Sequence, residues 1–183
     1  MRVPSSLVLA LGLALATVAS AEATSVTFTT ASLGGNHYEY TYEVSNNSLA
    51  VAIEELTIFF NYGTYENLVV TSPLADFDEI VAQPALVLGV PTAGFYDALT
   101  LTTGIAPGGQ AGGFSVSFDF LGVGLPGAQR FEIIDPDTFD TIASGQTAPA
   151  NGVPGGPVPE PSTLLLIGTG AAGLLRRRLI KRR

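Results

Sequence analysis

The chain has 183 residues, a formal net charge of −8, one His and no Cys or Trp. This length suits one ordinary domain and argues against a multidomain enzyme, and the lack of Cys excludes disulfides, thiol catalysis and thiolate metal sites. Between residues 24 and 161 the sequence has 15 acidic residues, and Arg130 is its only Lys or Arg. A segment this acidic excludes binding to nucleic acid, which requires a cationic surface.

The N-terminus has the pattern of a secretory signal peptide. Arg2 precedes an apolar run from Leu7 to Val18, and small residues with Ala19 and Ala21 follow. The run is shorter than the roughly 20 residues that a membrane-spanning helix needs, and its small-residue end is typical of a cleavage site. We therefore predict that residues 1–21 are a signal peptide, which signal peptidase removes after Ala21 or after Ala23. An uncleaved N-terminal anchor is the alternative.

The segment 24–147 alternates apolar and polar side chains with a period of two. In residues 37–44, for example, Tyr38, Tyr40 and Tyr42 share one face of the predicted strand. Further strands are predicted at 25–31, 51–60, 66–71, 95–102, 114–120, 130–134 and 139–143, with Gly, Pro and Asn turns between them. We predict an all-β fold, an antiparallel β-sandwich with a core that includes Tyr38, Tyr40, Phe60, Phe118 and Phe120. The only helical turn is predicted near 76–81.

The middle segment offers little catalytic chemistry. The single imidazole, His37, falls on the polar face of a strand, where a solvated side chain is expected. No Gly-x-Ser-x-Gly motif occurs, and adjacent carboxylates such as Glu54 and Glu55 point to opposite faces of a strand. We predict that the protein is not an enzyme. The alternative is an exported glycoside hydrolase with an unrecognised pair of carboxylates.

Three aspartates form the best candidate for a metal site. Asp135, Asp137 and Asp140 place three hard oxygen ligands in one loop, which suits Ca²⁺. The loop lacks the Gly and the final Glu of an EF-hand, and Asp also favours turns through local hydrogen bonds. We therefore expect a turn and no cofactor, with Ca²⁺ binding as the alternative.

The C-terminus has the pattern of a linker followed by a membrane anchor. Residues 148–158 are rich in Pro and Gly and are predicted to form neither a helix nor a strand ladder. Residues 162–175 carry no charge, and Arg176, Arg177 and Arg178 follow them. A helix over 162–180 would be about 28 Å long, close to the roughly 30 Å of a bilayer core. The arginines predict a cytoplasmic C-terminus, so the acidic segment faces outward.

The tail resembles a known sorting signal. Val158, Pro159, Glu160 and Pro161 precede the uncharged stretch and the arginine cluster, and this order is similar to the PEP-CTERM signal, which also circulates as the ice-binding protein C-terminal domain. The resemblance implies that an exosortase in the inner membrane of a Gram-negative bacterium recognises the Pro-Glu-Pro motif and processes the tail. It also implies a link to exopolysaccharide and biofilm. The middle segment resembles the Ig-like sandwich ectodomains often attached to such tails, through Asn46-Asn47 and the turn Ile105–Gly109 before Phe114.

These interpretations predict four parts: a signal peptide (1–21), a β-sandwich ectodomain (24–147), a linker (148–158) and a sorting signal (158–183). We expect an exported, non-enzymatic surface or extracellular-matrix protein. It is held first in the inner membrane, with its domain in the periplasm, and then moves to the cell surface or matrix. The expected partners are signal peptidase, exosortase and exopolysaccharide. An ice- or carbohydrate-binding module is a further alternative, although the Thr clusters near Thr27 and Thr100 are short for an ice-binding array.

Overall fold

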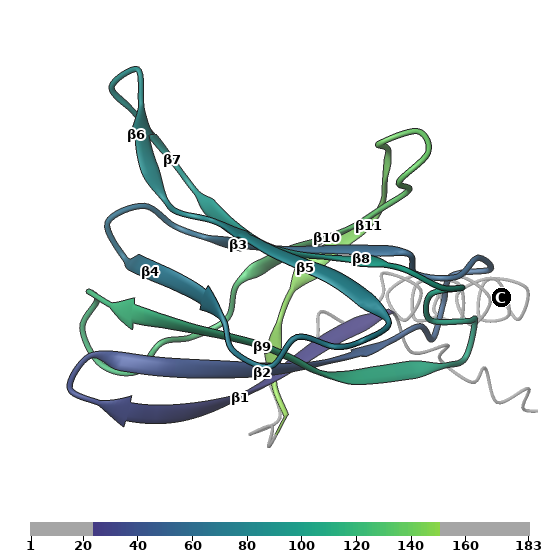
Figure 1. Ribbon diagram of the computed structural model, residues 1–183, viewed down its shortest axis with the longest axis horizontal. Helices are drawn as coiled ribbons and strands as arrows, with labels where there is room; N and C mark the ends of the chain where they lie inside the picture. Colours follow the sequence, from purple (N-terminus) through teal and green to yellow (C-terminus); the bar gives the residue numbers. More distant parts are fainter. Residues whose placement is uncertain (1–23, 151–183) are drawn as a thin grey trace, which may run out of the picture.

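The computed structural model describes residues 24–150 (Figure 1). Within this range the chain forms strands and turns and no helix, so none of it is a membrane-spanning helix. The predicted signal cleavage site at Ala19 and Ala21, the motif at 158–161 and the predicted helix at 162–180 lie outside the described residues. The prediction of an all-β fold is confirmed.

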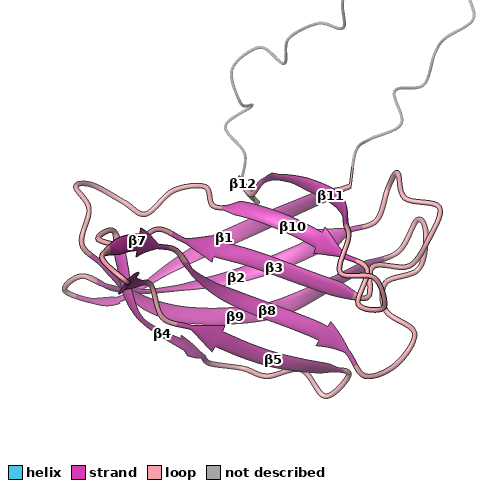
Figure 2. Ribbon diagram, turned by 90° about the horizontal axis from the view of Figure 1, so that it is seen from above, coloured by secondary structure: helices cyan, strands magenta, loops and turns pink. Residues whose placement is uncertain are grey.

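Two five-stranded sheets face each other, as Figures 1 and 2 show. The first sheet has the order β12 (Ala148–Pro149), β1 (Ser25–Gly34), β2 (His37–Ser45), β9 (Gln110–Phe120) and β4 (Tyr65–Val70). The second has the order β11 (Thr141–Gln146), β10 (Arg130–Ile134), β3 (Glu55–Phe60), β8 (Gly94–Thr100) and β5 (Phe77–Ala82). All neighbours in these sheets are antiparallel except β1 and β12, which are parallel.

The core lies between the two sheets and is rich in aromatic rings. Tyr40, Tyr42 and Val44 are fully buried on the inner face of β2, as the alternating pattern predicts. Phe60 on β3 and Phe118 on β9 meet across the interface with ring centroids 5.8 Å apart. In place of disulfides, burial of these large side chains stabilises the domain by about 2 kcal/mol each.

The predicted core is largely confirmed. Tyr40, Phe60 and Phe118 are fully buried, whereas Tyr38 and Phe120 are only partly buried and pack against the edge of the core. These last two lie near the ends of β2 and β9, where the opposite sheet covers the rings incompletely.

Two sequence expectations are wrong. The segment expected to hold a helical turn, 76–81, forms β5, because pairing with β8 decides its conformation and local propensity does not. Ala148 and Pro149, expected to be unpaired linker, form β12 opposite Thr27 and Phe28. Proline has no backbone N–H to donate to a neighbouring strand. It fits here because β12 is at the edge of its sheet and has no neighbour on its open side.

A small hairpin projects from the body and was not predicted. It consists of β6 (Ala85–Val87) and β7 (Val90–Thr92), and Figure 1 shows it rising away from the two sheets. Leu88 and Gly89 at its tip have φ of 52° and 82°. This is the backbone of a hairpin turn that favours Asn-Gly, so Leu88 occupies a conformation that costs a bulky L-residue energy. The Leu88 side chain is also fully exposed.

Candidate functional site

Two cavities lie at opposite ends of the second sheet. One is next to the start of β3 and the end of β10, and the other is next to the end of β3 and the start of β10. We call the first the acidic cavity; its lining is Val51, Ala52, Glu54, Ile134, Asp135, Pro136, Asp137 and Ile142. We call the second the neutral cavity; its lining is Phe59, Asn61, Thr64, Tyr65, Ala93, Phe120, Gly127, Ala128, Gln129, Arg130 and Gln146.

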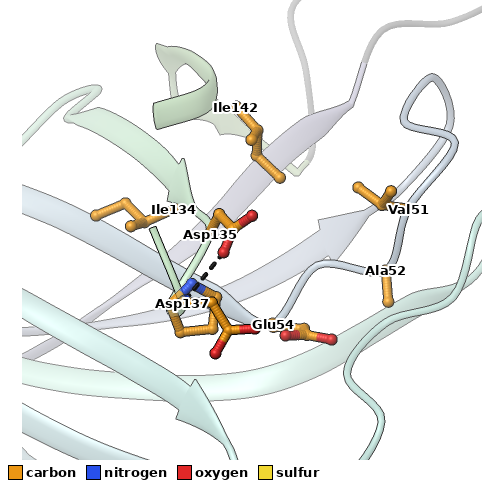
Figure 3. A pocket seen from close by; sticks show the side chains of 8 residues that line it. Val51, Ala52, Glu54, Ile134, Asp135, Asp137 and Ile142 are labelled. Atoms are coloured by element: carbon orange, nitrogen blue, oxygen red, sulfur yellow. Dashed lines mark hydrogen bonds between the residues drawn. The ribbon is translucent and has the colours of Figure 1, made fainter. Parts of the chain in front are cut away.

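The acidic cavity has a volume of about 320 Å³ and contains two of the three candidate calcium ligands (Figure 3). Asp135 Oδ1 accepts hydrogen bonds from the backbone N–H groups of Asp137, at 2.9 Å, and Thr138, at 3.2 Å. Asp140 does not line this cavity, and its carbonyl instead accepts the backbone N–H of Asp135. Asp135 therefore closes a local turn, which is the structure that we expected from its sequence.

Within residues 24–150 no three metal-ligating side chains come together in a group. The aspartates at 135, 137 and 140 therefore share a loop without forming a cluster of ligands. Calcium binding at this loop stays an untested alternative, and the hydrogen bonds of Asp135 account for its position without a metal.

The neutral cavity is larger, about 550 Å³, and no carboxylate lines it. The turn between β3 and β4 contributes Asn61 and Thr64, and the end of β11 contributes Gln146. Aromatic rings form part of its wall: Phe120 and Tyr65 pack with their ring centroids 5.4 Å apart. The volume lies within the roughly 300–1,000 Å³ of typical small-molecule sites, and the lining exposes more polar than apolar surface.

The floor of the neutral cavity is a buried hydrogen-bond network around Gln129. Its Nε2 lies 3.1 Å from the hydroxyl of Tyr40 and 3.0 Å from the hydroxyl of Tyr65 and also contacts the carbonyl of Gly127, so its two N–H groups are shared among three acceptors. Its Oε1 accepts from the hydroxyl of Tyr42 at 3.2 Å. Gln129 is only 3 % exposed, and the described residues leave no buried side-chain polar atom without a partner. Such a satisfied network holds the floor rigidly.

Burial keeps these phenols neutral. Desolvation is the main cause that raises the pKa of Tyr40 far above its ordinary value, and burial raises the pKa of Tyr42 in the same way. Both hydroxyls therefore remain protonated and donate hydrogen bonds at any physiological pH. The Tyr40 hydroxyl donates to the carbonyl of Gly127 at 2.8 Å, which fixes the loop before β10.

Arg130 supplies the only cationic group at the neutral cavity, and it is already engaged. Its guanidinium lies 3.8 Å from the centroid of the Phe59 ring and pairs with the carboxylate of Glu132. The ion pair with Glu132 partly offsets the charge of Arg130, whose side chain is 50 % exposed.

A second polar cluster lies on the outer face of the first sheet. His37 Nδ1 is 2.7 Å from Asp119 Oδ1, and Asn67 Nδ2 donates to Asp119 Oδ2 at 2.8 Å. The hydrogen bond from Asn67 and then that with His37 lower the pKa of Asp119. His37 has 40 % of its side chain exposed, in line with its predicted place on the polar face. No hydroxyl nucleophile bonds to this pair within residues 24–150.

The carboxylates with raised pKa lie on the second sheet. Desolvation raises the pKa of Asp97, although the Thr57 hydroxyl donates to it at 2.5 Å and opposes that shift. Desolvation followed by the charge of Asp97 raises the pKa of Glu55. Raised carboxyl pKa values are found in glycosidase acids, but neither residue lines the acidic or the neutral cavity. The pair therefore gives the hydrolase alternative no cleft at either place.

Sequence reasoning missed the residues of the neutral cavity. Asn61, Thr64, Gln129 and Gln146 come from separate turns and strand ends, and Asn and Gln in such places are ordinary. The sequence carries no local signal for them, because charge-free stretches also occur away from this cavity, for example at residues 98–118.

The tail and the domain give different results when they are compared with known proteins. A family model described as the PEP-CTERM protein-sorting motif matches residues 157–179. The chain carries a PEP-CTERM protein-sorting motif. The match confirms the resemblance seen in the sequence, and it implies an exported protein that is processed at a membrane, with exosortase as the processing partner. The matched range lies outside the described residues.

No curated protein matches the chain. Among solved structures, a similar one is the solution structure of the chitin-binding domain of Chi18aC from Streptomyces coelicolor. It has 18 % sequence identity and a TM-score of 0.36, and the likeness covers 60 % of this chain and 90 % of that domain. A TM-score this low does not establish a shared fold, so this likeness carries no ligand over to the chain.

Proposed function

We propose that this is an exported, non-enzymatic surface or extracellular-matrix protein that is delivered through the PEP-CTERM motif in its tail. Signal peptidase would remove residues 1–21, and the helix at 162–180 would hold the protein in the inner membrane with its domain in the periplasm. An exosortase would then process the tail and pass the domain to the cell surface or to a matrix that contains exopolysaccharide.

The match of the PEP-CTERM motif to residues 157–179 is the observation that carries this proposal. The composition of the domain supports it, because a Cys-free chain offers no thiol nucleophile and an acidic surface suits a domain that is exposed to water outside the cell. The positive cluster at Arg176, Arg177 and Arg178 supports the proposed orientation, since cationic flanks stay on the cytoplasmic side.

The strand order supports an Ig-like arrangement of the domain, which we include in the proposal. Ig domains place strands A, B, E and D on one sheet and C, F and G on the other. With β1, β2, β3 and β4 as A to D and β9, β10 and β11 as E to G, the two sheets have this order. The segment from β5 to β8 would then be an insertion between D and E that widens the second sheet beside β3.

Replacement of the central motif residue tests the sorting function. We expect Glu160→Ala to leave membrane insertion intact, because the uncharged stretch and the arginines are unchanged. Processing by exosortase should fail, so that the full-size protein stays in the membrane fraction. The measurement is the size and location of the protein in otherwise identical cells with and without the exosortase.

A triple variant provides the contrast. Arg176→Ala, Arg177→Ala and Arg178→Ala should weaken retention in the inner membrane before the enzyme acts, and so should change location in both kinds of cell. Equal maturation of the wild type and Glu160→Ala would contradict the proposal and reduce the tail to an ordinary anchor.

A further inference from the structure

The neutral cavity combines free hydrogen-bonding groups with aromatic walls. Among the uncharged polar side chains that line it, those of Asn61, Thr64 and Gln146 make no side-chain hydrogen bond to another of residues 24–150. Each amide offers two N–H donors and one carbonyl acceptor, and the hydroxyl of Thr64 can act in both ways. Gln129 differs from them, because the floor network already uses its amide.

The charges around the cavity select against ionic ligands. Glu132 pairs with Arg130, the one cationic residue in the lining, and so competes with an anionic ligand for it. The lining contains no carboxylate that could hold a cation. An anionic ligand would also meet a domain in which Asp and Glu greatly outnumber basic residues. The ligand that fits is therefore uncharged and rich in groups that both donate and accept hydrogen bonds.

The aromatic wall and the pairing of the strands at the cavity narrow the class of ligand further. Phe120 is a partly exposed ring beside the polar groups, which suits a ligand with apolar C–H faces next to hydroxyls. An extended peptide would instead bind by adding to an open strand edge. The edge strands β4 and β11 reach the cavity only through their end residues Tyr65 and Gln146, and β3 and β10 have partners on both sides.

We propose that the neutral cavity binds an uncharged sugar unit of an extracellular polysaccharide, with Asn61, Thr64 and Gln146 bonding its hydroxyls and Phe120 contacting its ring. The rigid Gln129 floor keeps these groups in place before the ligand arrives, which lowers the entropy cost of binding. This inference deepens the proposed function and rests on it for the setting, since a protein delivered to the surface or matrix meets polysaccharide there.

The test uses the full-length protein, purified in a nonionic detergent without a sugar headgroup, because a glycoside detergent would compete. Fluorescently labelled tetrasaccharides of glucose, mannose, galactose and N-acetylglucosamine serve as neutral ligands. A tetrasaccharide of uronic acids and an uncharged tetrapeptide serve as competing classes, and fluorescence polarisation measures the binding. We expect saturable binding of at least one neutral tetrasaccharide and no saturable binding of the uronic acid or peptide ligands.

Variants locate the site. Asn61→Ala and Gln146→Ala should each weaken binding about tenfold, since each removes one amide that bonds the sugar. Both side chains are exposed, so the unfolding midpoint should not change. Gln110→Ala is the matched control, an exposed Gln at the far end of β9, and it should bind as the wild type does.

Three results would overturn the inference: no neutral tetrasaccharide binds, the peptide or the uronic acid binds more tightly, or both cavity variants bind as well as Gln110→Ala. The test of sugar binding and the test of the sorting function give independent results. The cavity variants should be processed normally by exosortase, and Glu160→Ala should bind sugar normally, so either proposal can fail while the other stands.

Discussion

The two ends of the sandwich differ in how they use polar side chains. At the acidic end, Glu54, Asp135 and Asp137 surround a cavity, and the polar contacts of Asp135 are local turns. At the opposite end no carboxylate lines the cavity. There Gln129 bonds to the hydroxyls of Tyr40 and Tyr42, which lie 89 and 87 positions before it in the sequence.

The difference shows that charge alone is a poor guide to a built site. The carboxylates at the acidic end are conspicuous in sequence, but the hydrogen bonds of Asp135 close a local turn, which needs no tertiary arrangement. The amides are inconspicuous in sequence, and they form a site only because the fold brings them together. A site with few charges can therefore be the more organised one, and variants at each end can test this contrast.

The largest effect is expected at the floor of the neutral cavity. Gln129→Ala would leave the buried hydroxyls of Tyr42 and Tyr65 without their amide partner and would open a small void. We expect a loss of about 3 kcal/mol in the free energy of unfolding, measured by urea denaturation of the full chain. Gln146→Ala is the control, because its exposed amide should contribute almost nothing to stability. Equal urea midpoints for Gln129→Ala and Gln146→Ala would contradict a stabilising role of the hydrogen-bond network around Gln129.

A smaller effect is expected at the acidic end. Asp135→Ala removes the acceptor of two backbone N–H groups in an exposed turn, so we expect a loss of about 1 kcal/mol in stability. Asp135→Asn keeps a side-chain oxygen acceptor and should stay near the wild-type midpoint. Calcium chloride should shift neither midpoint if the loop is only a turn. A calcium-dependent rise in the wild type that Asp135→Ala abolishes would favour the metal site instead.

The smallest effect is expected at the hairpin tip, and it is stabilising. Leu88 has φ of 52° and buries nothing, so Leu88→Asn should relieve strain at no packing cost. We expect a gain of about 0.5 kcal/mol, seen as a higher urea midpoint. Leu86→Asn, on a regular strand position of the same hairpin, should give no such gain. A loss of stability in Leu88→Asn would mean that the exposed leucine makes contacts that stabilise the fold.

Much of the fold follows from the pattern of residues. The period of two in residues 37–44 and 114–120 correctly predicted the inner faces of β2 and β9. The pattern failed where short-range signals were weak or misleading: β5 is a strand because β8 pairs with it, and the β6–β7 hairpin has an unfavourable tip residue. For the candidate sites, the three aspartates were found by their proximity in sequence, whereas the four residues that define the neutral cavity were not found.

The sequence by itself determined the properties that depend on local or linear chemistry. These are the alternating strands, the Cys-free acidic composition and the sorting tail, since a processing enzyme and a membrane recognise contiguous residues. Only the tertiary structure decided which strands pair, and with them where the uncharged side chains meet. Asn61, Gln129 and Gln146 lie in one cavity because β3, β10 and β11 are neighbours in the second sheet, and no local pattern encodes that adjacency.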